Sequence, residues 1–153
     1  MVSGRRKELS MTAREVYKKL SEVRSARLSV ELLLDRLRSL DSLKTSIKSI
    51  LPKQDKVQTY GGGSRLEDII VEIDAKEELL QRYVHTYWRS EEEAKTLISL
   101  VENDTERLIL SKRFLDGKKW EIIAMETGYT MEWTQRLKKR GVREIARKTG
   151  GPQ

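Results

Sequence analysis

The stretch that decides the fold is "RLEDIIVEIDAKEELLQRYVHTYWRSEEEAKTLISLV", residues 65 to 101. Its apolar residues recur at alternating intervals of four and three, the spacing of a helix that buries one stripe against a partner helix. Ser64 and Glu67 have the spacing of a capping box at the start of this helix. The apolar row is Leu66, Ile70, Ile73, Leu80, Val84, Tyr87, Ala94, Ile98 and Val101, with Glu77 and Glu91 at its two gaps. We expect one long helix, with a candidate break at Ser90, where "SEEE" repeats the capping-box pattern.

A second long helix is expected upstream of this one. Thr12 and Glu15 again have the capping-box spacing, and Pro52 marks the end, because proline cannot continue a helix. Two overlapping apolar rows follow this helix. The first is Val16, Leu20, Val23, Val30, Leu34 and Leu37, interrupted by Arg27, and the second is Ala26, Val30, Leu33, Leu37, Leu40 and Ile47.

Residues 51 to 64, "LPKQDKVQTYGGGS", have the composition of a flexible link between the two helices. A phosphate-binding loop is disfavoured, because no strand precedes the glycines and no Gly-Lys-Ser/Thr follows them. Residues 1 to 64 carry 14 basic against 7 acidic residues, whereas residues 65 to 102 carry 5 against 10. Opposite charge and facing apolar rows predict an antiparallel hairpin over residues 12 to 101.

The charges alone leave a second interpretation open, in which they only solvate two faces. Exposed ion pairs contribute about 0 to 1 kcal/mol each, so they do not decide the pairing. The gaps at Arg27, Glu77 and Glu91 are either exposed or mark where a partner chain meets the hairpin.

Composition favours a small all-α protein. At 153 residues with 37% apolar content the chain fits one domain, or a small domain with an extension, and is too short for a large enzyme. Its net charge of +7 suits a polyanionic partner. The absence of cysteine excludes disulfides and thiolate metal sites and favours a reducing compartment. No 18-residue apolar run occurs and Arg5, Arg6 and Lys7 precede no apolar segment, so we expect a cytoplasmic protein without a membrane span.

Residues 102 to 148 are predicted to form a separate domain of three helices. Asn103 and Glu106 can cap the first, which "DGK" at 116 to 118 ends. The second begins near Trp120 and stops near Gly128, and Thr130 can cap the third. Helix, short turn and longer basic helix is the order of a helix-turn-helix. We expect residues 1 to 11 to be disordered and residues 149 to 153 to be a flexible tail.

The last helix has two different faces at 100° per residue. Thr134, Leu137, Gly141 and Ile145 share the face expected to point inward. Glu132, Gln135, Arg136, Lys139 and Arg143 share the opposite face, and Lys138 and Arg140 flank it. Gln and Arg can bond base edges in a major groove, while Lys and Arg neutralise phosphates. The alternative is a basic face that is only solvated, as most charge runs are.

Residues 107 to 145, "RLILSKRFLDGKKWEIIAMETGYTMEWTQRLKKRGVREI", resemble region 4 of bacterial sigma factors, which reads the promoter −35 element and docks on RNA polymerase. Residues 11 to 148 as a whole resemble a phage-encoded family with a helical N-terminal half and a sigma-region-4-like tail. That family is related to phage late-gene activators of the ArpU and RinA types.

The resemblance implies roles for individual residues. Trp120, Ile123 and Ala124 match the core of the first motif helix, Gly128 its turn and Thr130 its cap, and Met131, Glu132, Gln135 and Arg136 match positions that face bases or phosphates. The sequence departs from the pattern at Thr134, Gly141 and Ile122. The predicted DNA-binding set is Lys118, Lys119, Thr130, Met131, Glu132, Gln135, Arg136, Lys138, Lys139, Arg140 and Arg143.

Nothing in the sequence indicates an enzyme or a cofactor. His85 is the only histidine and cannot complete a catalytic pair or a zinc site by itself. Its neighbours Tyr83 and Trp88 are expected to be packing residues. Trp120 and Trp133 could stack on single-stranded bases, but their spacing beside Ile123 and Leu137 favours the wall of a small core.

The sequence therefore predicts a phage or prophage transcription regulator that binds double-stranded DNA through its tail. The hairpin is a candidate surface for homo-oligomerisation or for contact with host RNA polymerase. Nothing resembles the sigma region that melts the −10 element, so a complete initiation factor is not expected. Two alternatives remain: a DNA-packaging adaptor of the small-terminase kind, and a helical interaction protein that binds no DNA.

Overall fold

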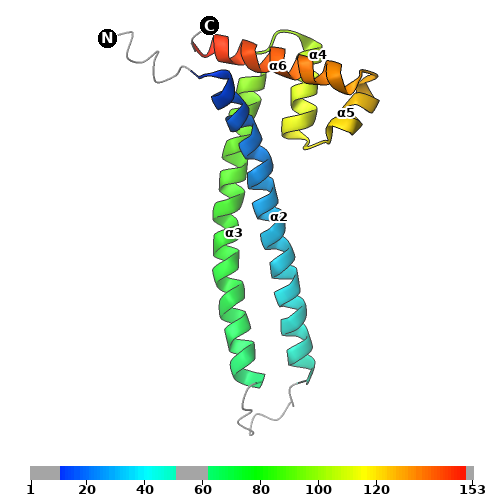
Figure 1. Ribbon diagram of the computed structural model, residues 1–153. Helices are drawn as coiled ribbons and strands as arrows, with labels where there is room; N and C mark the ends of the chain where they lie inside the picture. Colours follow the sequence, from blue (N-terminus) through cyan, green and yellow to red (C-terminus); the bar gives the residue numbers. More distant parts are fainter. Residues whose placement is uncertain (1–10, 51–61, 151–153) are drawn as a thin grey trace, which may run out of the picture. The chain divides into compact units, whose positions relative to one another are not determined.

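The computed structural model describes residues 11 to 50 and 62 to 150, without the side chains of residues 62 to 64. In these ranges it contains five α-helices, one π-helical turn and no strand. The elements are α2 (Ala13–Ile50), α3 (Gly62–Ile98), α4 (Asp104–Leu110), η1 (Ser111–Leu115), α5 (Trp120–Thr127) and α6 (Met131–Lys148) (Figure 1). The predicted all-α fold is confirmed. The expectations for residues 1 to 10, for residues 51 to 61 of the link and for residues 151 to 153 lie outside the described residues.

The chain forms two compact units, and each contains part of α2 and part of α3. The terminal unit is Met1–Ala26 with Tyr87–Gln153, and the middle unit is Arg27–Thr86. The predicted division at residue 102 does not coincide with the boundary between these units.

In the middle unit, α2 and α3 pair through a small apolar cluster. Leu40, Ile69 and Ile73 are buried, and Leu37 and Ile47 pack partly buried against them. A guanidinium nitrogen of Arg36 lies 3.2 Å from a carboxylate oxygen of Glu72. The predicted pairing of the two long helices is thus confirmed, and a basic residue of α2 meets an acidic residue of α3 beside the cluster.

The apolar row of α3 is one residue out at one predicted apolar position, and the other predicted members are buried or half-buried. Ile73 and Ala94 are buried as expected, but Ile69 is 5% exposed whereas the predicted Ile70 is 39% exposed. Ile69 and Ile70 are neighbours, so the sequence fits either frame equally well. Packing against α2 selects Ile69.

The two acidic gaps in the predicted row of α3 are explained in the same way, by a buried position one residue earlier. Lys76 and Ser90, each one residue before a predicted gap, are the more buried members there, and Glu77 is exposed. A lysine can bury its hydrocarbon stem and keep its charge in water. The Ser90 hydroxyl donates to the Tyr87 carbonyl at 2.9 Å, which satisfies it inside the unit. The prediction that Tyr83 and Trp88 are packing residues is wrong, because both lie beside this row and Trp88 is 61% exposed.

The ends of the long helices are partly as predicted. The Thr12 amide donates to Glu15 Oε2 at 3.3 Å and the Glu15 amide donates to Thr12 Oγ1 at 3.2 Å, so the first capping box is confirmed. Helix α3 begins at Gly62, two residues before the predicted start at Ser64. A helix already packed through Ile69 gains one hydrogen bond for each residue added, which glycine tolerates. No break occurs at Ser90.

Both apolar rows of α2 are used, one in each unit. Val16, Leu20 and Val23 of the first row are buried in the terminal unit, and Leu33 and Leu40 of the second are buried in the middle unit. Residues at heptad spacing rotate by about 20° per heptad around a straight α-helix. The first row therefore leaves the buried side of α2 along its length, and the second row replaces it there.

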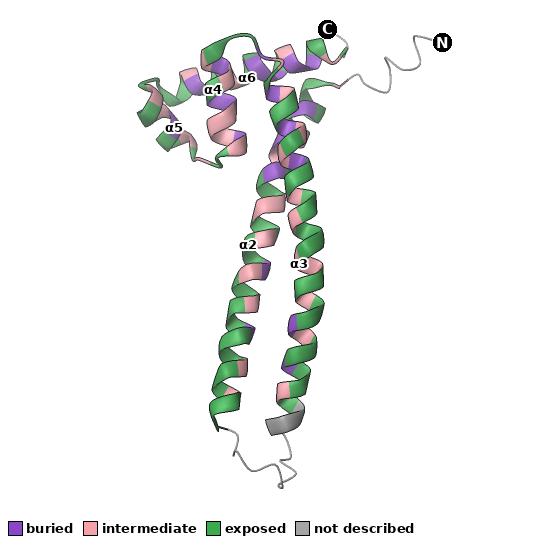
Figure 2. Ribbon diagram, turned by 180° about the vertical axis from the view of Figure 1, so that it is seen from behind, coloured by how far each residue is buried: buried purple, intermediate pink, exposed green. Residues whose placement is uncertain are grey.

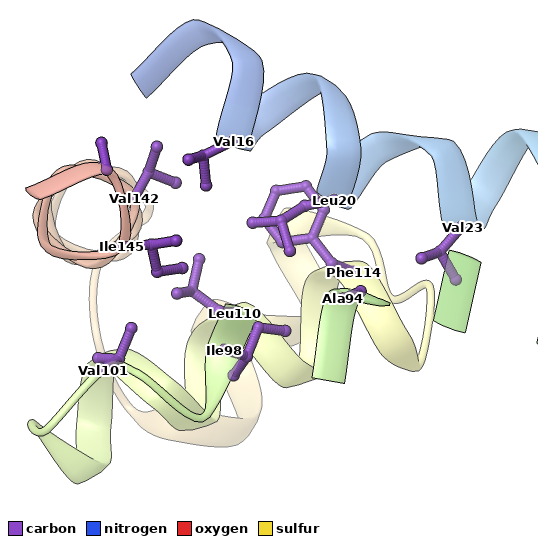
Figure 3. Close-up of a cluster of buried hydrophobic side chains, with 11 residues drawn as sticks. Val16, Leu20, Val23, Ala94, Ile98, Val101, Leu110, Phe114, Val142 and Ile145 are labelled. Atoms are coloured by element: carbon purple, nitrogen blue, oxygen red, sulfur yellow. The ribbon is translucent and has the colours of Figure 1, made fainter. Parts of the chain in front are cut away.

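The terminal unit contains the main core, in which α2, α3, α4, η1 and α6 meet (Figure 3). Figure 3 shows Val16 and Leu20 of α2 pointing toward Val142 and Ile145 of α6. The Tyr17 and Phe114 rings pack edge to face with centroids 5.8 Å apart. The buried members are Val16, Leu20, Val23, Ala94, Ile98, Val101, Leu110, Phe114, Val142, Ile145 and Ala146. The tail helices therefore share one core with the ends of both long helices.

Helices α4 and α6 approach each other closely at Gly141. A Cβ built there would lie 2.7 Å from Leu110 Cδ1, and Leu110 is fully buried. The close approach explains why a glycine stands inside a helix at a propensity cost of about 1 kcal/mol.

Leu20→Ala should lower the free energy of unfolding by about 2 to 5 kcal/mol, because the side chain is fully buried. Urea unfolding followed by circular dichroism and by tryptophan fluorescence should show both midpoints falling together. Leu28→Ala, the same deletion at a side chain that is 47% exposed, is the control and should cost under about 1 kcal/mol. A fluorescence midpoint that stays in place in Leu20→Ala would contradict the shared core.

Gly141→Ala should destabilise the protein by about 1 kcal/mol, because overpacking against Leu110 outweighs the gain in helix propensity. In a Leu110→Val background, which lacks the δ-carbons, the same change should cost less. Chemical denaturation of the four proteins measures the difference. A Gly141→Ala protein more stable than the wild type would exclude the close approach.

Candidate nucleic-acid interface

Helices α5 and α6 are joined by a tight turn, and hydrogen bonds at Gly128 and Thr130 fix its backbone. Gly128 ends α5 with φ of 75°, and its amide donates to the Ala124 carbonyl at 2.9 Å. This left-handed conformation favours glycine, although no atom within 4 Å would meet a Cβ there. Thr130 Oγ1 accepts a hydrogen bond from the Trp133 amide at 3.1 Å and caps α6. The predicted turn and cap are both present.

The two helices are held by a small core beneath the turn. Ile109, Ile123 and Leu137 are buried, with Trp120 and Trp133 packed partly buried against them. The tryptophans thus wall this core, as predicted. All four residues of the predicted inward face of α6 are buried: Thr134, Leu137, Gly141 and Ile145.

The opposite face of α6 is exposed, and Figure 2 shows exposed residues (green) between buried ones (purple) along this helix. Glu132, Arg136, Lys139 and Arg143 are exposed, and Gln135 is half-buried. Arg136 lies 3.2 Å from Glu132 in an exposed ion pair one turn apart. Such a pair contributes little to stability, so the guanidinium can exchange it for another anion at small cost.

The exposed face continues beyond the predicted set to Arg147. Arg136, Lys139, Arg140, Arg143 and Arg147 are all exposed and lie along one side of α6, and we call them the cationic row. Sequence reasoning missed Arg147, although its spacing of four from Arg143 was a usable signal. The guanidinium of Arg140 lies 5.4 Å from the Trp133 ring centroid.

Lys138 does not lie on this face. Its ammonium is 5.2 Å from the Tyr17 ring centroid and 5.4 Å from that of Trp120. Burial lowers the pKa of Lys138, and the charges of Lys139 and Arg113 lower it further. A lysine held over two rings contributes to packing, whereas the sequence suggested that it reaches a DNA backbone.

The lysines before α5 are in different situations. Lys118 Nζ lies 2.8 Å from Glu126 Oε1, and Lys112 Nζ lies 2.6 Å from Glu126 Oε2. Hydrogen bonds from Lys112 and then Lys118 lower the pKa of Glu126, and the bond to Glu126 raises the pKa of Lys118. Lys119 is exposed beside the start of α5. Of the predicted set, Lys118 is therefore already paired, Thr130 is used as a cap, and Met131 is 40% exposed.

Two further observations concern other kinds of site. Among the described residues, no group of three His, Cys, Asp or Glu side chains is placed to hold a metal ion. No helix in the same ranges combines the length and apolarity needed to cross a bilayer. His85 is exposed on α3.

Comparison with models of protein families, with curated proteins and with solved structures found no match to this chain.

Proposed function

We propose that the protein binds double-stranded DNA through α6 and acts as a phage-encoded transcription regulator. In this proposal α5, the Gly128 turn and α6 work as a helix-turn-helix. The single observation that carries it is the cationic row, which is exposed on a helix whose other face is buried. A fixed helix with one outward basic face is what major-groove docking requires.

Size and charge of α6 support the proposal. Its 18 residues span about 27 Å at roughly 1.5 Å per residue, and they include seven cations against two acids. The major groove is about 12 Å wide and admits one such helix. Counterion release from phosphates would then supply most of the affinity and make it fall steeply with salt.

The roles within α6 follow from position. Gln135 and Arg136, near the N-terminal end of α6, are the proposed readers of base edges, since recognition helices present this end to the bases. Lys139 and Arg143 are the proposed phosphate contacts. Lys138 is left out, because its ammonium lies over Tyr17 and Trp120.

The proposed role in transcription rests on the resemblance to sigma region 4 described above. In that role, the middle unit of α2 and α3 offers a surface for RNA polymerase or for a second copy, and exposed apolar side chains such as Leu32 at 70% and Val71 at 67% suit such a contact. A coupling free energy of about 1 to 3 kcal/mol between DNA and polymerase would change promoter occupancy by roughly 5- to 150-fold.

Exposed apolar residues on the long helices also fit a DNA-packaging adaptor that assembles into a ring. Light scattering distinguishes the two functions, since a ring of roughly eight or more subunits would favour the adaptor and a monomer or dimer the regulator.

Arg136→Ala should weaken binding to a selected DNA site by about 1 to 3 kcal/mol and reduce its preference over random DNA. Lys139→Ala should weaken both alike and lower the salt slope by about one unit. Fluorescence anisotropy with duplexes selected from a random pool, at two salt concentrations, measures these effects.

Two comparisons make this test specific. Lys138→Ala should change the salt slope less than Lys139→Ala, and Arg82→Ala, an exposed change in the middle unit, should leave binding unaltered. Absence of duplex binding by the wild type even at low salt would remove the DNA proposal and leave the interaction-protein alternative.

A further inference from the structure

A pocket of about 850 Å³ lies beside the C-terminal half of α6. Its wall is formed by Ala13 at the start of α2, by Glu102, Asn103 and Glu106, and by α6, all within the terminal unit. This volume falls within the roughly 300 to 1,000 Å³ of small-molecule sites. Neither the DNA proposal nor the fold accounts for it.

Glu106 is the most unusual group in the pocket wall. The residue is 8% exposed, yet its carboxylate forms no hydrogen bond or ion pair with any residue in the described ranges. The Glu106 backbone amide donates to Oδ1 of Asn103, the N-cap of α4, at 3.0 Å. The Glu106 side chain takes no part in this cap. Burial raises the pKa of Glu106, the charge of Glu144 raises it further, and Arg140 opposes both. No buried side-chain oxygen of the described residues lacks a hydrogen-bond partner, so the Glu106 carboxylate, which has none, reaches the solvent of the pocket. A donor on a bound ligand can replace that water.

Three arginines line the same pocket on α6. Arg140, Arg143 and Arg147 form no ion pair with a residue in the described parts of the chain. The other two carboxylates of the wall share one cation, because Lys148 Nζ lies 3.1 Å from both Glu102 Oε1 and Glu144 Oε1. Arg143, Arg147 and the Glu106 carboxylate thus have no ion-pair partner among the described residues, whereas Arg140 already lies over the Trp133 ring. A ligand that pairs with these two arginines and with Glu106 carries negative charge and also N–H donors.

We propose that this pocket binds a guanine nucleotide, with its phosphates on Arg143 and Arg147 and its base edge on Glu106. A carboxylate accepts two parallel N–H bonds, and guanine is the common base that presents two adjacent donors, N1–H and the 2-amino group. Adenine and cytosine place an acceptor beside their amino group, which would face the carboxylate and be repelled. The small side chains of Ala13 and Ala146 leave room for a flat ring, on which the Arg140 guanidinium can stack.

Nucleotide binding does not depend on the proposed function, but its expected effect on DNA binding does. Arg143 and Arg147 belong to the cationic row, so bound phosphates would neutralise part of the DNA-binding face. If the protein binds DNA as proposed, GDP should lower its affinity for the duplex, whereas failure of DNA binding leaves the nucleotide site intact.

Calorimetric titration of the full chain with GDP, ADP, CDP, UDP and inorganic pyrophosphate tests the proposal. GDP should bind about tenfold or more tightly than ADP, as two charged hydrogen bonds imply. Glu106→Gln should abolish this preference, because glutamine offers one acceptor and one donor. Arg147→Ala should weaken all diphosphates by the same factor, while Arg24→Ala, an exposed change outside the pocket, should weaken none.

Three results would overturn the inference. These are no binding of any nucleotide at millimolar concentration, equal affinity for GDP, ADP and pyrophosphate, and a guanine preference that survives in Glu106→Gln. Shifts of the Ala13 and Asn103 amide resonances on adding GDP should localise the ligand, and shifts confined to other regions would count equally against it.

In the absence of nucleotide, the Glu106→Gln protein should be at least as stable as the wild type at neutral pH. The raised pKa of Glu106 means that its charged form destabilises the folded state above that pKa. The stability advantage of the variant should shrink as pH falls through the raised pKa, and vanish below the ordinary carboxyl value, where both states are protonated. Thermal unfolding across the acid range measures this. A variant less stable than the wild type at neutral pH would show that Glu106 already has a partner, and the site would be lost.

Discussion

The burial of one side of α6 is the constraint on which the rest of the terminal unit depends. Leu137 packs with Ile109 and Ile123, while Val142 and Ile145 join the core that includes α2 and α3. Because two clusters hold the same helix, it can neither rotate nor tilt without opening one of them. The outward direction of the cationic row is therefore fixed by apolar packing and not by the charges themselves.

This arrangement links the hairpin to the candidate interface. The first turns of α2 contribute Val16 and Leu20 to the core beneath α6, and Tyr17 lies against Lys138. A partner that altered the packing of these turns would act directly on the support of α6. Coupling between the proposed DNA contact on α6 and a proposed partner on α2 would thus need no long pathway, since both places share the same buried side chains.

The sequence predicted the elements that periodicity and caps determine. The Thr12 cap, the Gly128 turn, the Thr130 cap and the inward face of α6 are local patterns, and the structure has all of them. The sequence did not predict whether Ile69 or Ile70 is buried in the α3 row, because that choice depends on packing against α2. The place of Lys138 over two rings and the unpartnered Glu106 depend on residues far away in the chain, so no local pattern could reveal them.

The outward face of α6 is the proposed DNA-binding surface. Mapping amide resonances of the full chain during titration with duplex DNA tests it most directly, because the map does not depend on any substitution. The largest shifts should fall within residues 130 to 143 and diminish as salt is added. Shifts confined to α2 and the N-terminal part of α3, or none at low salt, would contradict it.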